Sequence, residues 1–398
     1  MPANGKGFST TTRRVLTRRG VLWLGQTCNL RCHFCYFQNR ISSAEHPDHP
    51  FMSLDKAKGI CSTLRGHYGN TAIDIQGGEP TIHPDINALV AHCREIGLLP
   101  TLITNALVLD KRERCQALVD AGLRDLLVSV HGLREDYDRA VGLPGGHVRQ
   151  MKALDNLVAL GIPFRFNCVL AKSVLGHLAE ISRLAVETGA RVVNFIAFNP
   201  FEDQQKNARS GADVPRYTDV RGPLVEALDY LELHGVEANV RYLPLCQVPE
   251  RHRKSFYNFQ QLPYDLHEWD YASWSWTGRN PQRRRDGDLE EPVSLRWANS
   301  RSKMFGYEGY LEAPSVSPED EYRHSAYIRA REHCGYKFAP ACEACGLKGI
   351  CDGFHGDYAS LHGADEARTQ DIPLVEDPKF YISRQVKIVE DEDADWAG

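Results

Sequence analysis

Residues 27–37 read TCNLRCHFCYF and place three cysteines, Cys28, Cys32 and Cys35, within eight positions directly after a short apolar run. A structural zinc site takes four ligands, usually in two close pairs, and this triplet has no second pair nearby. His33 is an awkward fourth ligand because it stands between two of the cysteines. A four-iron, four-sulfur cubane held by three thiolates keeps one iron free of protein ligands, and that iron can bind a substrate or cofactor. We therefore interpret the missing fourth ligand as functional.

The composition is that of an ordinary globular protein. The chain has 398 residues, of which 42% are hydrophobic and 25% charged, and its formal net charge is −5. This charge argues against a nucleic-acid partner, which would require a surplus of Lys and Arg. The first residues lack the apolar core of a secretory signal, and no apolar run reaches the length of a membrane span. We therefore expect a cytoplasmic protein with no membrane partner.

Twelve cysteines in a cytoplasmic chain are not explained by a disulfide framework, because thiols are kept reduced in that compartment. Clustered cysteines then indicate metal binding or catalysis. Four cysteines stand apart in amphipathic or strand-like segments, and we interpret them as small buried hydrophobic residues: Cys61, Cys93, Cys115 and Cys168.

From residue 20 to about residue 243, short β-rich runs alternate with amphipathic stretches, which indicates repeated βα units around a parallel sheet. In such sheets, functional groups gather at the carboxyl ends of the strands. Helices are expected over 53–67, 110–121, 178–188 and 223–233. The predicted strands cover 21–24, 72–76, 99–104, 125–130, 163–170, 192–198 and, as a seventh, 236–242.

A second motif stands at the end of the second predicted strand. Residues 75–84 read IQGGEPTIHP, and two glycines in that position let a backbone approach a ligand closely. The three-cysteine stretch and this motif together resemble the radical S-adenosylmethionine (radical SAM) superfamily. Besides the cysteines, the residues that carry the resemblance are Tyr36, Gly77, Gly78, Glu79 and Pro80.

The resemblance covers residues 17–243 and implies a partial, TIM-like (βα)6 barrel. It also implies that S-adenosylmethionine binds the free iron and that reductive cleavage yields a 5′-deoxyadenosyl radical, which takes a hydrogen atom from the substrate. An external electron donor such as flavodoxin or ferredoxin is implied as a partner. Further cofactor contacts are expected by analogy from polar residues at later strand ends, each of which can equally cap a helix: Thr104, Asn105, Ser129, His131 and Asn167.

A second group of cysteines lies near the C-terminus. Cys334, Cys342, Cys345 and Cys351 fall within eighteen residues. Their spacing resembles the SPASM and twitch extensions of radical SAM barrels, which hold an auxiliary four-iron, four-sulfur cluster. Zinc is the alternative, because structural zinc sites also use close pairs of cysteines. His355 stands where the full SPASM pattern has a further cysteine, so one auxiliary cluster is expected rather than two.

The sequence does not decide which residue is the fourth ligand of this auxiliary site. Either Cys334 or Cys246, which lies at the end of the seventh predicted strand, can complete the set. The expected organisation has five parts: an N-terminal extension (1–16), the barrel (17–243), an irregular aromatic and charged connection (244–333), the auxiliary segment (334–375) and a C-terminal tail (376–398). The last residues of this tail, 389–398, read VEDEDADWAG and are expected to be frayed because they are acidic.

The substrate is expected to be a polar small molecule such as a sugar, an aminocyclitol or a nucleoside-like compound, oxidised after hydrogen abstraction. Only about 19 residues precede the first predicted strand, too few for the leader-binding domain of peptide-modifying members. Residues 256–276 mix aromatic rings with carboxylates, which suits stacking on sugars and cations. A peptide or protein maturase is the first alternative. A non-enzymatic iron–sulfur or zinc protein is the second.

Overall fold

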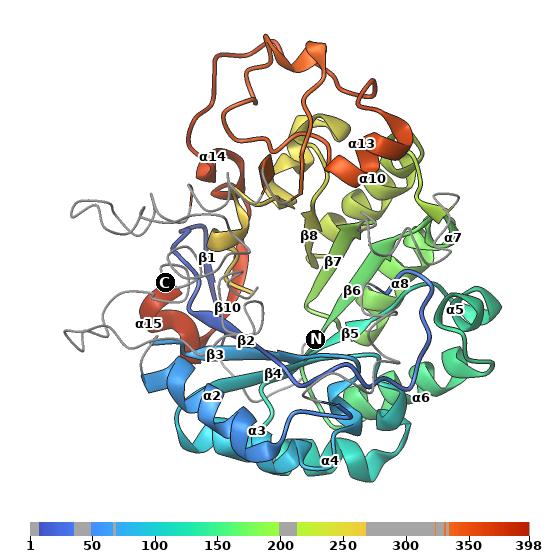
Figure 1. The fold of residues 1–398 in the computed structure, drawn as a ribbon, viewed down its shortest axis with the longest axis vertical. Coiled ribbons are helices and arrows are strands. Elements are labelled where there is room, and N and C mark those ends of the chain that lie inside the picture. The colour runs from blue at the N-terminus through green and yellow to red at the C-terminus, as the bar shows by residue number, and fades with distance from the viewer. Residues whose placement is uncertain are drawn as a thin grey trace.

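The computed structural model describes residues 8–35, 49–66, 69–198, 213–267, 323, 330–331 and 334–397. Its centre is one sheet of eight parallel strands, which follow one another in chain order and curl into a half-barrel (Figure 1). The predicted partial barrel is therefore confirmed. The eighth strand was not predicted, because two residues are too few for a recognisable alternation. The strands are β2 (Arg19–Trp23), β3 (Ala72–Gln76), β4 (Leu99–Thr104), β5 (Asp125–Ser129), β6 (Phe164–Leu170), β7 (Val192–Ala197), β8 (Glu237–Arg241) and β9 (Phe256–Tyr257).

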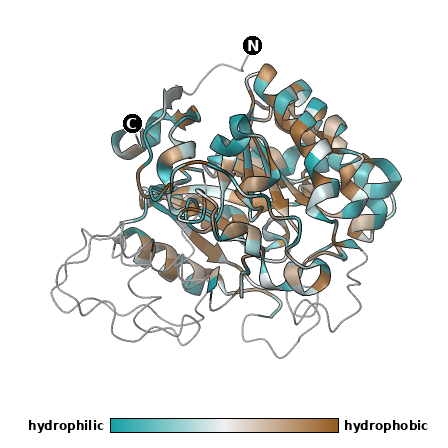
Figure 2. Ribbon diagram, turned by 90° about the horizontal axis from the view of Figure 1, so that it is seen from above, coloured by the Kyte–Doolittle hydropathy of each residue, from teal (hydrophilic) through white to brown (hydrophobic). Residues whose placement is uncertain are grey.

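The helices of the barrel lie on the outer side of this sheet (Figure 1). In Figure 2 the central strands are mostly hydrophobic, whereas the surrounding helices alternate between hydrophobic and hydrophilic residues, as expected when one helix face packs on a sheet. None of the helices in the described residues combines the length and apolarity that crossing a membrane requires. The helices are α2 (Leu54–Gly66), α3 (Ile86–Glu95), α4 (Arg112–Asp120), α5 (Arg134–Val141), α6 (Gly146–Ala159), α7 (Lys172–Leu175), α8 (Leu178–Thr188) and α10 (Tyr217–Leu233).

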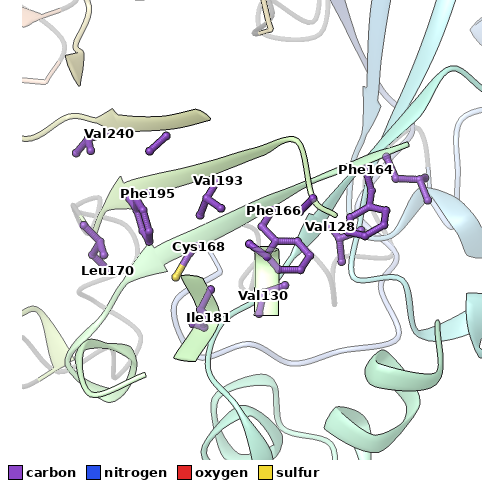
Figure 3. Close-up of a cluster of buried hydrophobic side chains, with 14 of the residues drawn as sticks. Val128, Val130, Phe164, Phe166, Cys168, Leu170, Ile181, Val193, Phe195 and Val240 are labelled. Carbon is purple, nitrogen blue, oxygen red and sulfur yellow. The ribbon is translucent and has the colours of Figure 1, made fainter. Parts of the chain in front are cut away.

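Strand β6 shows how the sheet separates a core from a polar interior. Side chains alternate along a strand, so Phe166 and Cys168 face the helices and join the same buried cluster as Ile181 of α8 (Figure 3). Arg165 and Asn167, which alternate with them along the strand, point to the other face of the sheet. The isolated cysteines belong to the apolar side and are fully buried, as predicted: Cys61, Cys93, Cys115 and Cys168.

The C-terminal residues form ordered elements, among them a strand of a second sheet, so the expected fraying is wrong for residues 389–397. Strand β10 (Lys387–Glu390) pairs antiparallel with β1 (Phe8–Thr11). The short helices α14 (Lys379–Ile382) and α15 (Ala394–Ala397) precede and follow it. An acidic composition suggested a solvated tail, but these carboxylates pair with buried cations of the barrel.

Buried ion pairs join the C-terminal segment to the amino ends of the barrel strands. The Lys387 ammonium is 2.6 Å from Glu237 and 3.0 Å from Asp265. Arg124, directly before β5, contacts both Glu390 and Asp393. Because a buried charge is costly unless it has a partner, the C-terminal segment completes the barrel electrostatically.

Candidate functional site

The three-cysteine loop follows β2. Cys28, Cys32 and Cys35 are half-buried, and none of them forms a disulfide. Burial raises the pKa of the Cys28 thiol to about 12, and the nearby Glu79 carboxylate adds to the rise. Such a thiol gives up its proton readily only when a metal cation takes its place. A 3.1 Å hydrogen bond from the Cys35 amide to the Cys32 carbonyl closes the end of the loop.

The first half of this loop packs against the GGEP loop, residues 77–80, which follows β3. The amides of Gly78 and Glu79 donate to the carbonyls of Gly25 and Thr27, each at 2.9 Å. A β-carbon at Gly78 would lie 2.1 Å from the Thr27 oxygen. The sequence predicts a close approach of this backbone to a ligand; the close approach that the structure shows at Gly78 is to the cysteine loop itself.

Glu79 is buried and bridges the ends of β3 and β4. Its carboxylate accepts hydrogen bonds from the Thr104 hydroxyl at 2.6 Å and from the Asn105 amide at 2.7 Å. Thr81 also donates to it, and burial raises the pKa of Glu79 in spite of these bonds. Pro80 opens a short 3-10 helix (Pro80–Ile82) beside it. In this structure Glu79 and Thr104 fix the GGEP loop from within the protein.

Asn105 connects the end of β4 to the cysteine loop. Its side-chain amide donates to Oδ1 of Asn29 at 2.8 Å and lies 4.0 Å from the Cys28 sulfur. Asn29 was not singled out from the sequence, although its place inside the cysteine motif was a signal.

The other residues predicted to contact the cofactor lie in different environments. His131, after β5, is buried and lies edge-on to Phe34 of the cysteine loop, with ring centroids 4.4 Å apart. Burial lowers the pKa of His131 to about 3, so its ring is neutral. Ser129 offers its backbone carbonyl to the Gln150 side chain at 2.8 Å. Tyr36 lies outside the described residues.

Two buried amide oxygens near these strand ends have no hydrogen-bond partner among the described residues. They are Oε1 of Gln26, two residues before the first cysteine, and Oδ1 of Asn167 on β6. Buried polar atoms are nearly always paired, so these oxygens fit a polar ligand. Together with the three cysteine thiols, these oxygens suit a thiolate-bound cluster with a polar cofactor beside it.

Four further cysteines line one pocket. Cys246, Cys342, Cys345 and Cys351 share a cavity with an empty volume of about 330 Å³, which includes its open mouth. Cys334 is not among the lining residues; it packs beside a separate cluster that contains Tyr336. The structure thus brings Cys246, and not Cys334, to the other three.

Backbone amides surround these sulfurs. The amide of Gln370 donates to the Cys345 sulfur at 3.4 Å. Burial raises the pKa of Cys351 to about 12, and the Cys246 thiol adds to the rise, while amide bonds from Leu245 and Gly353 oppose it. Hydrogen bonds to sulfur are typical of iron–sulfur sites. Within the described residues, no three His, Cys, Asp or Glu side chains are grouped closely enough for a single metal ion.

The C-terminal segment that lines this pocket is hydrogen-bonded to the first turn of α10. The amide of Tyr217 donates to the Tyr358 hydroxyl, and the amide of Thr218 donates to Glu366, each at 2.8 Å. Two cations, Lys348 and Arg368, line the pocket beside the thiols. Neither residue was predicted from the sequence, although Lys348 stands between Cys345 and Cys351 and could have been recognised as part of the site.

Comparison with protein families identifies the first cysteine loop. The model of the radical SAM superfamily matches residues 24–184, which include both the cysteine loop and the GGEP loop. Residues 24–184 are a radical SAM domain. This family uses a four-iron, four-sulfur cluster and S-adenosylmethionine, so the predicted family and its two cofactors are confirmed.

Individual relatives of the radical SAM domain cover only part of each chain. PqqA peptide cyclase of Rhodopseudomonas palustris is 34% identical over 173 residues, which are 43% of this chain and 44% of the relative. Fe-coproporphyrin III synthase of Methanosarcina barkeri is 31% identical over 168 residues, 42% of this chain and 41% of the relative. This chain thus spans less than half the length of these curated relatives.

The solved structure of SuiB from Streptococcus suis, bound to its precursor peptide SuiA, is also similar. It shares 15% identity and a TM-score of 0.49, covering 79% of this chain and 73% of SuiB. A likeness of this size adds nothing to the functional reasoning about the radical SAM domain.

The predicted small-molecule substrate is wrong. PqqA peptide cyclases from several bacteria match the radical SAM part of the chain. These relatives are named for a peptide substrate, which favours the peptide alternative over a sugar, an aminocyclitol or a nucleoside. The prediction relied on the aromatic and acidic residues over 256–276, of which residues 268–276 lie outside the described part. Tyr257, Tyr264 and Asp265 are fully buried, and Asp265 pairs with Lys387. These side chains pack the protein instead of lining a substrate site.

Proposed function

We propose that this protein is a radical SAM enzyme that modifies a residue of a peptide or protein substrate. The observation that carries the proposal is the similarity of its radical SAM domain to PqqA peptide cyclases. The bound cluster and S-adenosylmethionine would supply a hydrogen-abstracting radical. The chain's own residues would hold the peptide, orient it and exclude water from the reacting atoms.

The first cluster is assigned to Cys28, Cys32 and Cys35. The buried oxygens of Gln26 and Asn167 are suited to accept hydrogen bonds from the ammonium or hydroxyl groups of S-adenosylmethionine. Among the other residues expected to bind this cofactor, we assign a positioning role to those that fasten the cysteine loop: Gly77, Gly78, Glu79, Thr104, Asn105 and His131.

One auxiliary four-iron, four-sulfur cluster is assigned to the pocket of Cys246, Cys342, Cys345 and Cys351. Four thiols with backbone amides aimed at them suit a cluster whose net charge must be offset. Lys348 and Arg368 would contribute positive charge at its edge. This assignment leaves Cys334 outside the ligand set.

The compartment and the electron supply follow from the same chemistry. None of the twelve cysteines is in a disulfide, and clustered reduced thiols are typical of reducing compartments, so we propose a cytoplasmic location. Reductive cleavage of S-adenosylmethionine needs one electron from outside the chain. A flavodoxin or ferredoxin is the class of partner that would deliver it.

The substrate class is tested with the reconstituted protein, S-adenosylmethionine and dithionite under anaerobic conditions. The probes are synthetic peptides translated from short reading frames beside the gene, with glucosamine as the small-molecule comparison. We expect one peptide to stimulate formation of 5′-deoxyadenosine and to change in mass, typically by the loss of two hydrogens. Cleavage stimulated by glucosamine, with every peptide unchanged, would contradict the peptide proposal.

A further inference from the structure

The C-terminal end of α5 holds the second half of the cysteine loop. The last carbonyls of a helix lack partners inside the helix. Here the Val141 carbonyl accepts from the Arg31 amide at 2.9 Å, and the Ala140 carbonyl accepts from the His33 amide at 3.1 Å. Nδ1 of the His33 ring also lies 3.1 Å from the Ala140 oxygen. The cysteine loop therefore caps α5.

The same histidine ring reaches a third element. Its Nε2 contacts the carboxylate of Asp213, which follows β7 in the chain and precedes α10. The side chains are only partly exposed, 39% for His33 and 25% for Asp213. His33 is thus held by an oxygen atom at each ring nitrogen and joins three parts of the barrel: the cysteine loop, the end of α5 and the segment before α10.

The contact between His33 and Asp213 bears on the cysteine motif because His33 stands between two of its cysteines. His33 lies inside the turn that the Cys35 amide closes onto the Cys32 carbonyl. The first cysteine, Cys28, is fastened instead through Asn29 and Asn105. The two halves of the loop therefore have separate anchors, and the spacing between Cys28 and the other two thiols depends on both.

We propose that the Asp213–His33–Ala140 chain of contacts is a positioning device that sets Cys32 and Cys35 relative to Cys28 for cluster binding. This inference rests on the proposed function of the three thiols as cluster ligands. Residues that orient metal ligands through hydrogen bonds typically change metal affinity by about 10–100-fold when they are replaced. The segment before α10 thereby acts on the cluster site from outside the cysteine motif.

The test compares iron release from the anaerobically reconstituted protein in the presence of a strong iron chelator. His33→Asn keeps a donor near the Nδ1 position but no longer reaches Asp213, and Asp213→Asn removes the carboxylate charge. His177→Asn is the matched control, because the shorter side chain no longer reaches Asp136 on α5, which the Nε2 atom of His177 contacts at 2.8 Å away from the loop. The melting temperature of each apo protein reports on the fold.

We expect both variants to lose iron from the three-cysteine site about tenfold faster than the parent. The electron paramagnetic resonance change on adding S-adenosylmethionine should be altered in both variants. The iron release of His177→Asn and the melting temperatures of all the apo proteins should stay near those of the parent. The double variant should be no worse than either single variant, since both break one chain of contacts. Release at the parental rate in both variants would overturn the inference, as would faster release that follows a lowered apo melting temperature. A parent without any iron at this site would instead refute the proposed function.

Discussion

At the residue scale, Gly78 belongs to a motif that the sequence identified, but its main contact in the structure was not predicted. Two adjacent glycines at a strand end predicted a close backbone approach. The sequence could not show that the approaching backbone is that of the cysteine loop, because this contact joins residues far apart in the chain. Gly78 therefore controls the position of Cys28 before any cofactor binds.

Gly78→Ala should destabilise the apo protein by more than about 2 kcal/mol and prevent assembly of the first cluster, because the new β-carbon would lie 2.1 Å from the Thr27 oxygen. Urea unfolding and iron content measure the two effects. Gly59→Ala on α2 is the control: it meets nothing within 4 Å and should stabilise the helix by about 0.5–1 kcal/mol. A Gly78→Ala protein with parental stability and iron content would contradict the packing role.

The auxiliary ligand set also could not be chosen from sequence, because the spacing of nearby cysteines says nothing about a cysteine on a distant strand end. Cys246 lines the pocket with three other cysteines and Cys334 does not. Cys246→Ala should therefore lose about four irons per chain, whereas Cys334→Ala should keep them. Iron analysis of the two variants decides between them, and the reverse pattern would exclude Cys246 as a ligand.

At the scale of elements, the predicted strands agree with the structure more closely than the predicted helix before β8 does. Strands in a parallel sheet are short apolar runs that sequence marks clearly. The predicted helix started at residue 223 because its apolar periodicity was recognised only from there. The observed α10 begins at Tyr217 because Tyr358 and Glu366, from the C-terminal extension, satisfy its first amides. Because these hydrogen-bond partners lie far along the chain, the sequence near residue 217 gives no signal that the helix begins there.

Replacing Glu366 should test this capping. Glu366→Gln removes the charge that caps the amide of Thr218, and the expected cost is about 1 kcal/mol in the free energy of unfolding. Asp365→Asn is the control, since Asp365 is 75% exposed and pairs with Arg216 at the surface. Chemical denaturation of both apo proteins compares them. Equal losses in the two variants would argue against a capping role.

At the scale of the whole molecule, the C-terminal strand β10 pairs with β1 in a sheet of its own and is joined to the barrel by buried ion pairs. The sequence indicated a parallel sheet from local periodicity, but pairing of the two chain ends and burial of their charges are long-range events. Glu237 illustrates the result: burial raises its pKa, but Lys387 and His267 outweigh burial and lower the pKa to about 2.

The pH dependence follows from the lowered pKa of this carboxylate. A carboxylate with a lowered folded-state pKa stabilises the fold above its unfolded pKa, and this stability is lost as pH falls through the folded pKa. The apo parent should therefore lose about 3 kcal/mol from Glu237 alone as pH falls from about 4.5 to 2.

Lys387→Met should cost about 3–5 kcal/mol at pH 7, because it leaves Glu237 and Asp265 without their cation. It should also reduce the loss of stability on acidification. Denaturation midpoints between pH 7 and pH 3 measure both effects. An unchanged acid dependence in this variant would show that the buried lysine does not control these carboxylates.

The most direct test of the central claim is a combined iron count and 5′-deoxyadenosine assay on two proteins, the parent and the variant with Cys28, Cys32 and Cys35 all replaced by Ala. After anaerobic reconstitution, the parent should hold about eight irons per chain and cleave S-adenosylmethionine. The variant should hold about four irons, in the pocket of Cys246, and form no 5′-deoxyadenosine. Reductive cleavage that persists in the variant would contradict the assignment of the three-cysteine loop, and tightly bound zinc without iron in the variant would contradict the auxiliary cluster.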